Sequence, residues 1–201
     1  MKLFLTSSGL TNKCLSAKLR EILSPIKNPK TLIVADIKGE DDRFYLKAVE
    51  AELDDAGVSN HSVFNLNTDI VAGDFLDIDL FYLCGGNTFH IIHRLRATGL
   101  HKVIIAQVES GRSVYLGVSA GSIIAGPNIE IASWGSERDE NEINLKDLSG
   151  FGFTDTAIFP HFRDELEDEV SEFRRRAAYP VREVGDGEAI YIEDGEEEFV
   201  Y

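Results

Sequence analysis

The segment 117–122 (GVSAGS) carries the residue types and spacing of a nucleophilic serine turn. It follows the apolar run 114–116 and precedes the apolar run 123–125, so a buried strand leads into a small-residue turn and then a helix. In a G-x-S-x-G turn of this kind the serine hydroxyl projects at the helix N-terminus, where partial positive charge favours a developing anion. We therefore predict that Ser119 is a nucleophile for acyl transfer; the alternative is a serine that only caps the helix.

His161 is the candidate base for this serine, because a serine nucleophile needs a general base. It follows a short apolar run at 156–159 and Pro160, which restricts the residue before it and stiffens the approach. In open α/β sheets, sites form outside the carboxyl ends of the strands, where Ser119 and His161 would both arrive. The alternative is a loop histidine with a structural hydrogen bond.

A second glycine turn, at 84–89 (CGGNTF), also follows an apolar run. In the simplest interpretation Asn87 caps the next helix and the glycines form a tight turn. The functional interpretation adds an oxyanion site, in which the backbone N–H groups of Gly86 and of Ala120 hold the negative charge. Gly86, Asn87 and Ala120 are therefore the candidate oxyanion and substrate-binding residues.

The other histidines and the cysteines indicate no metal centre and no disulfide framework. His90 and His93 stand one helical turn apart, but no carboxylate or third ligand accompanies them. Of the two cysteines, Cys84 lies in an apolar run and is expected to be a small buried hydrophobe. We expect no cofactor and no metal.

Length and charge limit the classes of protein that the chain could represent. Its 201 residues fit one domain, 1–201, with a sizeable core. The formal net charge of −15 disfavours nucleic acids and anionic membranes as partners. The apolar run at the N-terminus is too short for a signal peptide, and no stretch is apolar enough to span a bilayer. We expect a cytoplasmic protein, either a monomer or a homodimer.

Short apolar runs alternate with amphipathic stretches through most of the chain. Strands are expected at 3–6, 31–36, 62–66, 80–84, 113–118 and 156–159. Helices are expected at 41–56, 87–98 and 101–110, each ending at or near a glycine. This alternation predicts an α/β sandwich with a mostly parallel sheet.

The last part of the chain has a different pattern. The charged stretch 163–178 predicts an exposed helix, which Pro180 ends. Short strands are expected at 182–184, 188–192 and 197–201, joined by glycine-containing turns. We expect these strands to be antiparallel at one edge of the sheet, where the acidic run 196–198 discourages pairing between sheets.

Three blocks, in this order, resemble the signature of the peptidase E family: 83–89 (LCGGNTF), 117–122 (GVSAGS) and 159–162 (FPHF). That family comprises aspartyl dipeptidases and their relatives, including cyanophycinases, and the resemblance covers nearly the whole chain. It implies a three-layer α/β sandwich related to class I glutamine amidotransferases, with a serine nucleophile on a strand-to-helix elbow. By this resemblance Ser119 matches the nucleophile, His161 the general base, and the Gly-Gly-Asn turn the oxyanion region.

The resemblance also implies a third catalytic residue, an acid in a glycine-containing turn near the C-terminus. The best-known members have glutamate there, whereas the matching turn here is 184–187 (VGDG), which selects Asp186. Glu183 and Glu188 flank it and remain alternatives, and Asp186 could instead be a β-turn residue. Because aspartate is shorter than glutamate, the backbone would have to approach His161 more closely.

The resemblance implies a short peptide substrate with an N-terminal aspartate, whose carboxylate needs a buried cation, usually arginine. Arg163 and the run 174–176 are candidates, although acids at helical spacing favour an exposed, ion-paired face. Trp134 could line the pocket or anchor a surface loop. The leading hypothesis is a serine peptidase of the exopeptidase or dipeptidase type. The alternatives are a non-peptidase serine hydrolase, such as an esterase or amidase, and a catalytically silent binding protein of the same fold.

Overall fold

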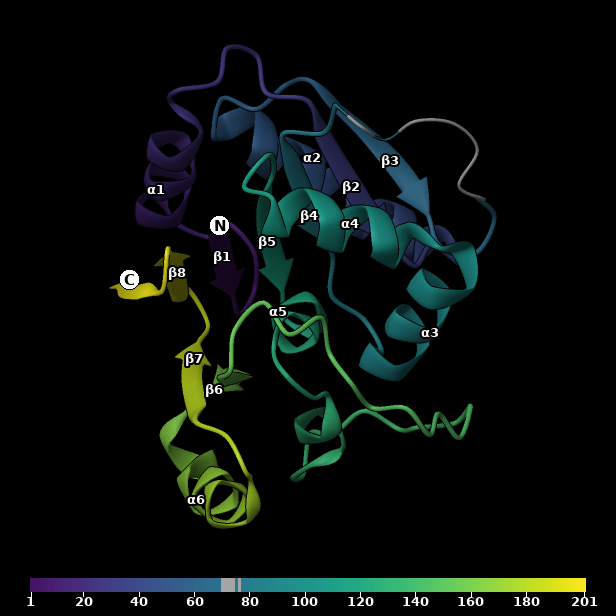
Figure 1. The fold of residues 1–201 in the computed structure, drawn as a ribbon, viewed down its shortest axis with the longest axis vertical. Helices are drawn as coiled ribbons and strands as arrows, with labels where there is room; N and C mark the ends of the chain where they lie inside the picture. Colours follow the sequence, from purple (N-terminus) through teal and green to yellow (C-terminus); the bar gives the residue numbers. More distant parts are fainter. Residues whose placement is uncertain (70–74, 76) are drawn as a thin grey trace.

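The computed structural model describes residues 1–69, 75 and 77–201, and its main feature is a mixed sheet (Figure 1). The sheet has seven strands in the order β3-β2-β4-β5-β1-β8-β9. These strands are β1 (Lys2–Thr6), β2 (Thr31–Ala35), β3 (His61–Asn65), β4 (Leu80–Leu83), β5 (Val114–Val118), β8 (Ala189–Glu193) and β9 (Glu196–Val200). Neighbours from β3 to β1 are parallel, and β8 and β9 continue the sheet in antiparallel fashion. The predicted α/β fold with a mostly parallel sheet is confirmed.

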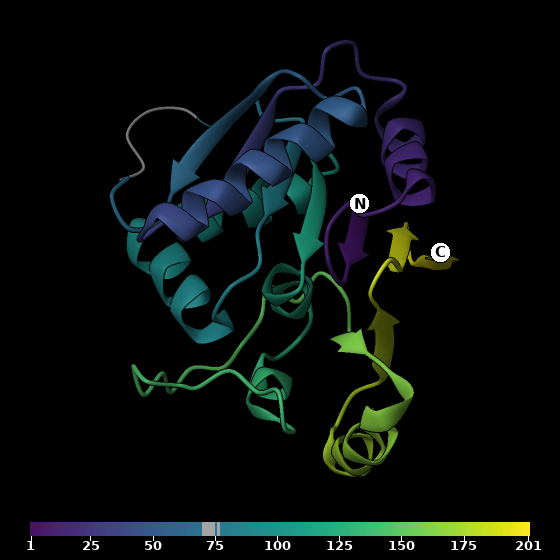
Figure 2. The same ribbon diagram turned by 180° about the vertical axis from the view of Figure 1, so that it is seen from behind.

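Helices cover both faces of this sheet, as the two opposite views show (Figures 1 and 2). One face carries α1 (Lys13–Leu23) and α2 (Glu40–Asp55), and the other carries α3 (Thr88–Thr98), α4 (Leu100–Glu109) and α5 (Ala120–Ala125). Side chains alternate between the faces: Phe4 of β1 belongs to the buried cluster of α1 and α2, whereas Leu3 and Leu5 belong to the cluster of α3, α4 and α5. The result is three layers, helix, sheet and helix.

The segment from 157 to 185 forms a second, smaller sheet. β6 (Ala157–Phe162) and β7 (Val181–Gly185) are its two strands, and they run parallel. The expectation that all three C-terminal strands lie antiparallel at the edge of the main sheet is therefore wrong for β7 and correct for β8 and β9. The reason is the connection: α6 (Glu167–Arg176) returns the chain to the start of β6, and such a crossover allows a parallel pair.

The expected helices are found, with differences at the ends and in burial. Those expected at 41–56, 87–98 and 101–110 begin and end within one residue of α2, α3 and α4. The stretch 163–178 instead holds a short 3-10 turn (Asp164–Leu166) and the shorter α6, and Val170 and Phe173 of α6 are buried. Another 3-10 turn spans Glu130–Ser133. α1 lies outside the sequence prediction; Asn12 caps it by accepting a hydrogen bond from Leu15 N at 3.0 Å.

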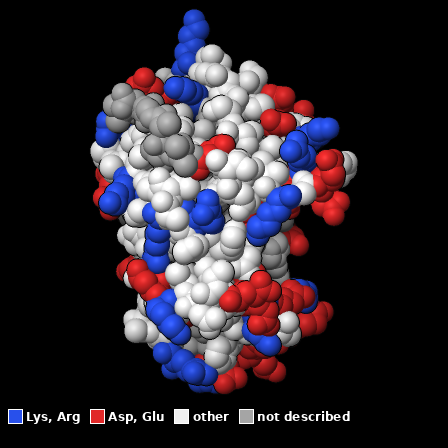
Figure 3. All heavy atoms as spheres, turned by 90° about the vertical axis from the view of Figure 1, so that its right-hand side faces the viewer, with Lys and Arg blue, Asp and Glu red and all other residues white. Residues whose placement is uncertain are grey.

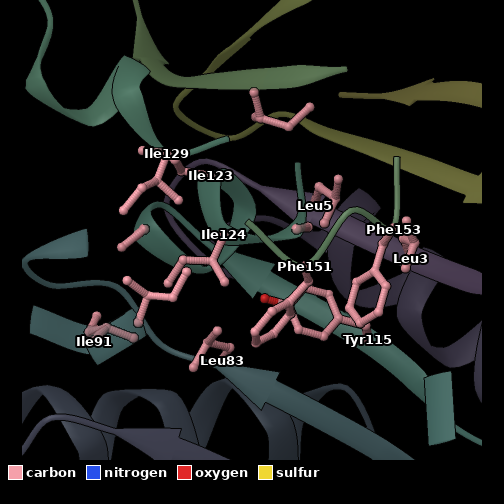
Figure 4. Packing of buried hydrophobic residues seen from close by; sticks show 14 of the residues in the cluster. Leu3, Leu5, Leu83, Ile91, Tyr115, Ile123, Ile124, Ile129, Phe151 and Phe153 are labelled. Atoms are coloured by element: carbon pink, nitrogen blue, oxygen red, sulfur yellow. The ribbon is translucent and has the colours of Figure 1, made fainter. Parts of the chain in front are cut away.

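An aromatic cluster fixes α5 against the sheet (Figure 4). The ring of Tyr115 on β5 lies 6.1 Å from that of Phe151 and 5.2 Å from that of Phe153, both edge to face. The Tyr115 hydroxyl donates a hydrogen bond of 2.7 Å to the Gly121 carbonyl in α5. The strand and the helix that flank the serine turn are thus held together by buried contacts.

The surface carries charges of both signs. On the face shown in Figure 3, Lys and Arg are interspersed with Asp and Glu, so the net charge of −15 does not make that face uniformly acidic. Among the helices of the described residues, none has both the length and the apolar character that crossing a bilayer requires.

Candidate active site

The serine turn between β5 and α5 has a strained backbone. Ser119 has φ 49° and ψ −109°, a conformation that costs a non-glycine residue roughly 1–3 kcal/mol. Two glycines make the turn possible: a Cβ on Gly117 would lie 2.6 Å from the carbonyl carbon of Gly121, and a Cβ on Gly121 would overlap the Leu83 carbonyl. The local packing therefore requires glycine on both sides of the serine, as the G-x-S-x-G pattern predicts.

The end of β1 ties this turn to the neighbouring strand. The Thr6 carbonyl accepts hydrogen bonds from Ser119 N at 3.1 Å and from Ser122 Oγ at 2.7 Å. The Thr6 hydroxyl donates to the Gly117 carbonyl at 3.2 Å. Because Thr6 and Ser122 are fully buried, water does not compete for these bonds.

The structure brings Ser119, His161 and Asp186 into one hydrogen-bonded chain. Ser119 Oγ lies 2.9 Å from His161 Nε2, and His161 Nδ1 lies 2.8 Å from Asp186 Oδ1. His161 lies in β6, where the pairing with β7 skips from Pro160 to Phe162, and this bulge gives His161 a φ of 57°. Asp186 follows β7 directly. The small sheet thus carries the imidazole and the carboxylate to the serine on the main sheet.

The other two candidate acids lie elsewhere. Glu183 forms an ion pair with Arg174. Glu188 accepts a hydrogen bond from Gly185 N at 2.7 Å through its Oε2. Within the described residues, Asp186 is therefore the one candidate acid that contacts His161.

Ser7 connects the imidazole to the carboxylate, and sequence reasoning did not include it. Its Oγ donates to Asp186 Oδ1 at 2.8 Å and accepts from the His161 backbone N–H at 2.8 Å. It also lies 3.3 Å from His161 Nδ1. Ser7 is fully buried at the end of β1, so one hydroxyl holds both the acid and the backbone of the histidine.

These contacts act on the ionisation of Asp186. Partial burial would raise the pKa of this carboxyl, but hydrogen bonds from Ser7 and His161 and the charge of a protonated His161 outweigh it. The pKa of Asp186 therefore lies below its ordinary value, and the carboxylate stays ionised at neutral pH.

The glycine turn after β4 faces the serine. A Cβ on Gly85 would lie 3.3 Å from Ser119 Cβ, and Gly86 has φ 133°. Ala120 is the first residue of α5, so its N–H has no acceptor within the helix. Asn87 caps α3, as its structural interpretation predicts: Oδ1 accepts from His90 N at 3.0 Å, while Nδ2 donates to the Glu140 carbonyl at 2.9 Å.

The sequence of this chain is similar to those of known proteins. Residues 3–200 match the model of the family described as peptidase family S51. The chain belongs to peptidase family S51. It is 27% identical over 166 residues to an uncharacterized peptidase of Listeria monocytogenes, covering 76% of each chain. It is 31% identical to a peptidase E of Citrobacter koseri over 62% of this chain and 51% of that one. The resemblance to peptidase E is confirmed, and the chain is a serine-type peptidase, a hydrolase.

A solved structure shares the fold of this S51 peptidase. The crystal structure of a Listeria monocytogenes protein provisionally described as a peptidase E superposes with a TM-score of 0.77 and 24% sequence identity. The match covers 98% of this chain and 96% of that one. The likeness therefore includes both the main sheet and the small sheet that carries His161.

Two hollows in the S51 peptidase meet at Ser119. The first, which we call the inner pocket, has a volume of about 230 Å³ and includes Ser119, His161, Gly86 and Thr88 in its wall. Its apolar lining consists of Ile123, Ile131, Trp134, Phe159 and Leu166, and its charged lining of Glu137, Arg138, Asp139 and Glu169. Trp134 is thus a pocket residue, and it is also anchored, because its Nε1 donates to the Glu169 carbonyl at 2.8 Å.

The second hollow, the outer groove, is more open, with a volume of about 370 Å³. Like the inner pocket it includes Gly86, Ser119 and His161, and it extends past Ser7 and Tyr45. A chain bound across Ser119 would therefore have space on both sides of the attacked bond.

The arginines considered for an aspartate side chain do not line the inner pocket. Arg163 donates to Glu137 Oε2 at 2.8 Å in a two-pronged ion pair. Arg174 pairs with Glu183, as described above, and Arg176 places its guanidinium carbon 4.7 Å from the centre of the Trp134 ring. Arg175, which lies between these two residues in the sequence, is exposed to solvent. Among the described lining residues, the basic group is instead Arg138.

Proposed function

We propose that this S51 peptidase is an exopeptidase that hydrolyses short peptides through a Ser119–His161–Asp186 triad. The observation that supports it is the continuous hydrogen-bonded chain from Ser119 Oγ through both ring nitrogens of His161 to Asp186 Oδ1, with the serine on a strained turn. That arrangement suits a serine whose proton must be removed as it attacks.

In the proposed reaction, Ser119 Oγ attacks the scissile carbonyl while His161 Nε2 takes the hydroxyl proton. Asp186 accepts from Nδ1–H, which fixes the tautomer and stabilises the imidazolium that forms. The N–H groups of Gly86 and Ala120 hold the oxyanion, and loss of one such donor typically costs about 10²–10³ in rate. His161 then protonates the leaving amine, and a water molecule hydrolyses the acyl-enzyme.

The size of the inner pocket supports a short substrate. Its volume of about 230 Å³ lies below the roughly 300 Å³ at the lower end of pockets for drug-sized ligands. A pocket of this size accommodates about one residue on one side of the attacked bond, so the proposal takes short peptides as the substrates.

A panel of dipeptides tests the proposal, with release of free amine as the readout. The wild type should cleave some members, and Ser119→Ala should lower kcat by about 10³-fold or more. Ser62→Ala is the matched control, because Ser62 is exposed on β3 and should leave the rate unchanged. Wild-type activity in Ser119→Ala would overturn the proposal, as would a folded wild type that cleaves no dipeptide.

A further inference from the structure

The inner pocket is suited to the residue whose carbonyl is attacked. It is smaller and more enclosed than the outer groove; both hollows include Gly86 of the oxyanion turn, but only the inner pocket continues to Thr88 among the described lining residues. The outer groove is open and can hold the leaving part of the substrate. In an exopeptidase of short peptides, the inner pocket would then receive the N-terminal residue.

The charged groups of this pocket are mostly carboxylates. Glu137 is already paired with an arginine, as described above. Asp139 Oδ2 accepts a hydrogen bond from Thr88 N at 2.8 Å, and Glu169 Oε2 accepts one from Ser136 N at 2.9 Å. Within the described residues, the second oxygen of Asp139 and that of Glu169 have no protein donor and remain able to accept from a ligand.

Arg138 does not balance these carboxylates. Its Nε lies 3.6 Å from a carboxylate oxygen of Glu140, and its side chain is 53% exposed. The pocket therefore presents three carboxylates, of which Glu137 is neutralised by Arg163, and one half-exposed guanidinium. A substrate aspartate would add a further negative charge and lose its hydration, which disfavours its ionised form. An apolar side chain would instead bury surface against Trp134 and its apolar neighbours.

The acceptors nearest the oxyanion turn are suited to an ammonium group. The α-amino group of an N-terminal residue is attached to the carbon next to the attacked carbonyl, so its partners must lie close to Gly86. Thr88 is two positions further along the chain and is bonded to Asp139. The Thr88 hydroxyl is buried and, within the described residues, has no hydrogen-bond partner. The hydroxyl is fully buried and does not reach the pocket, so the acceptor that lines the pocket here is the carboxylate of Asp139.

We infer that the inner pocket selects an N-terminal residue with an apolar side chain and a free, protonated α-amino group, which Asp139 holds. This inference rests on the proposed function and differs from the N-terminal aspartate that the family resemblance implied. The carboxylate of Asp139 supplies the charge, and the apolar walls around Trp134 supply the side-chain preference.

The test compares Leu-Ala, Phe-Ala, Asp-Ala and N-acetyl-Leu-Ala as substrates of the wild type. We expect kcat/KM for Leu-Ala and Phe-Ala to exceed that for Asp-Ala by about tenfold or more. Acetylation removes the charged donor and should lower kcat/KM for the leucine substrate by about 10–100-fold.

The variant Asp139→Asn separates the negative charge of this side chain from its structural hydrogen bond to the backbone. The amide oxygen can still accept from Thr88 N, but the negative charge is lost, so acetylation should now change kcat/KM by only about twofold. Asp168→Asn is the matched control, an exposed aspartate on α6, and should keep the full effect of acetylation.

The outcomes distinguish this inference from the proposed function. Ser119-dependent cleavage that is best on Asp-Ala, or equal on free and acetylated substrates, overturns the inference and leaves the peptidase mechanism standing. Loss of Asp-Ala cleavage in Arg138→Gln would also overturn the inference, because it would show that Arg138 binds the aspartate side chain of the substrate. Failure of the folded wild type to cleave any of the four substrates would count against both.

Discussion

The nucleophile and its base–acid pair lie in two regions that are built in different ways. Ser119 lies on the main sheet, where the glycines beside it pack against backbone and Thr6 binds the turn from a buried strand. His161 and Asp186 come from the small sheet, and their side chains are 43% and 68% exposed. Ser7, at the end of β1, joins the two regions.

This difference shows that the two regions depend on different kinds of contact. The serine turn is held by packing without spare room, so any added atom there disturbs the backbone. The base–acid pair is held by a few hydrogen bonds. Removing one of them leaves the packing of the surrounding side chains nearly unchanged. Substitutions in the first region should therefore affect stability and rate together, whereas those in the second should affect rate and ionisation.

The largest effect in the exposed region is expected at the acid. Asp186→Asn removes the charge that stabilises the imidazolium and can turn an NH₂ donor toward His161, which favours the wrong tautomer. We expect kcat to fall by about 10²–10⁴-fold with little change in thermal stability. Steady-state kinetics and a thermal melt check this; an unchanged kcat would show that Asp186 is not the triad acid.

A change in the packed region should alter both properties. Gly121→Ala places a methyl group against the Leu83 carbonyl, and such overpacking typically costs about 1–3 kcal/mol. The resulting displacement of Ser119 should lower kcat by about 10²-fold. Denaturant unfolding and kinetics on the same sample measure the two effects. The comparison is Gly39→Ala, because no atom lies within 4 Å of the added Cβ and a φ of −144° suits any residue. A loss of rate without loss of stability would contradict the contrast between the regions.

The connection between the regions is tested by Ser7→Ala. Removing the hydroxyl deletes a hydrogen bond to a charged group, so we expect kcat to fall by about tenfold. That bond lowers the pKa of Asp186, so its loss should raise this pKa, and the carboxyl should titrate at higher pH than in the wild type. Carboxyl NMR titration measures the shift. Ser7→Thr, which restores the hydroxyl, should recover part of the rate. If Ser7 had only a structural role, the pKa of Asp186 in Ser7→Ala would be the same as in the wild type.

The smallest effect is expected at an acid that the sequence could not separate from Asp186. Glu183 pairs with Arg174 and does not contact His161. Glu183→Gln should change kcat/KM by no more than about twofold, because its carboxylate contacts Arg174 and no residue of the triad. A large loss in this variant would mean that the acid assignment is wrong.

The same contrast explains how much could be predicted from the sequence. The strand, turn and helix around Ser119 are local, so an apolar run followed by closely spaced glycines predicts them. The parallel pairing of β6 and β7 is not local, since it depends on α6 returning the chain, and the residues of a short strand do not identify the strand that it pairs with.

Two features of the site had weak or no signals in the sequence. Ser7 is one serine among several, and its importance comes from contacts 154 and 179 positions away. The sequence distinguishes Asp186 from Glu183 and Glu188 only by the family resemblance, because three acids within six positions look alike until the turn is folded. α1 does have a signal in the sequence, because Asn12 is followed by apolar residues at helical spacing. The prediction above makes no use of that signal.

The most direct test of the central claim is labelling with a fluorophosphonate, located by peptide mass spectrometry. If Ser119 is the nucleophile and the small sheet activates it, the wild type should carry one adduct, on Ser119. The adduct should be absent from Ser119→Ala and should form much more slowly in Asp186→Asn. A folded wild type that carries no adduct, or carries it on another residue, would contradict the account.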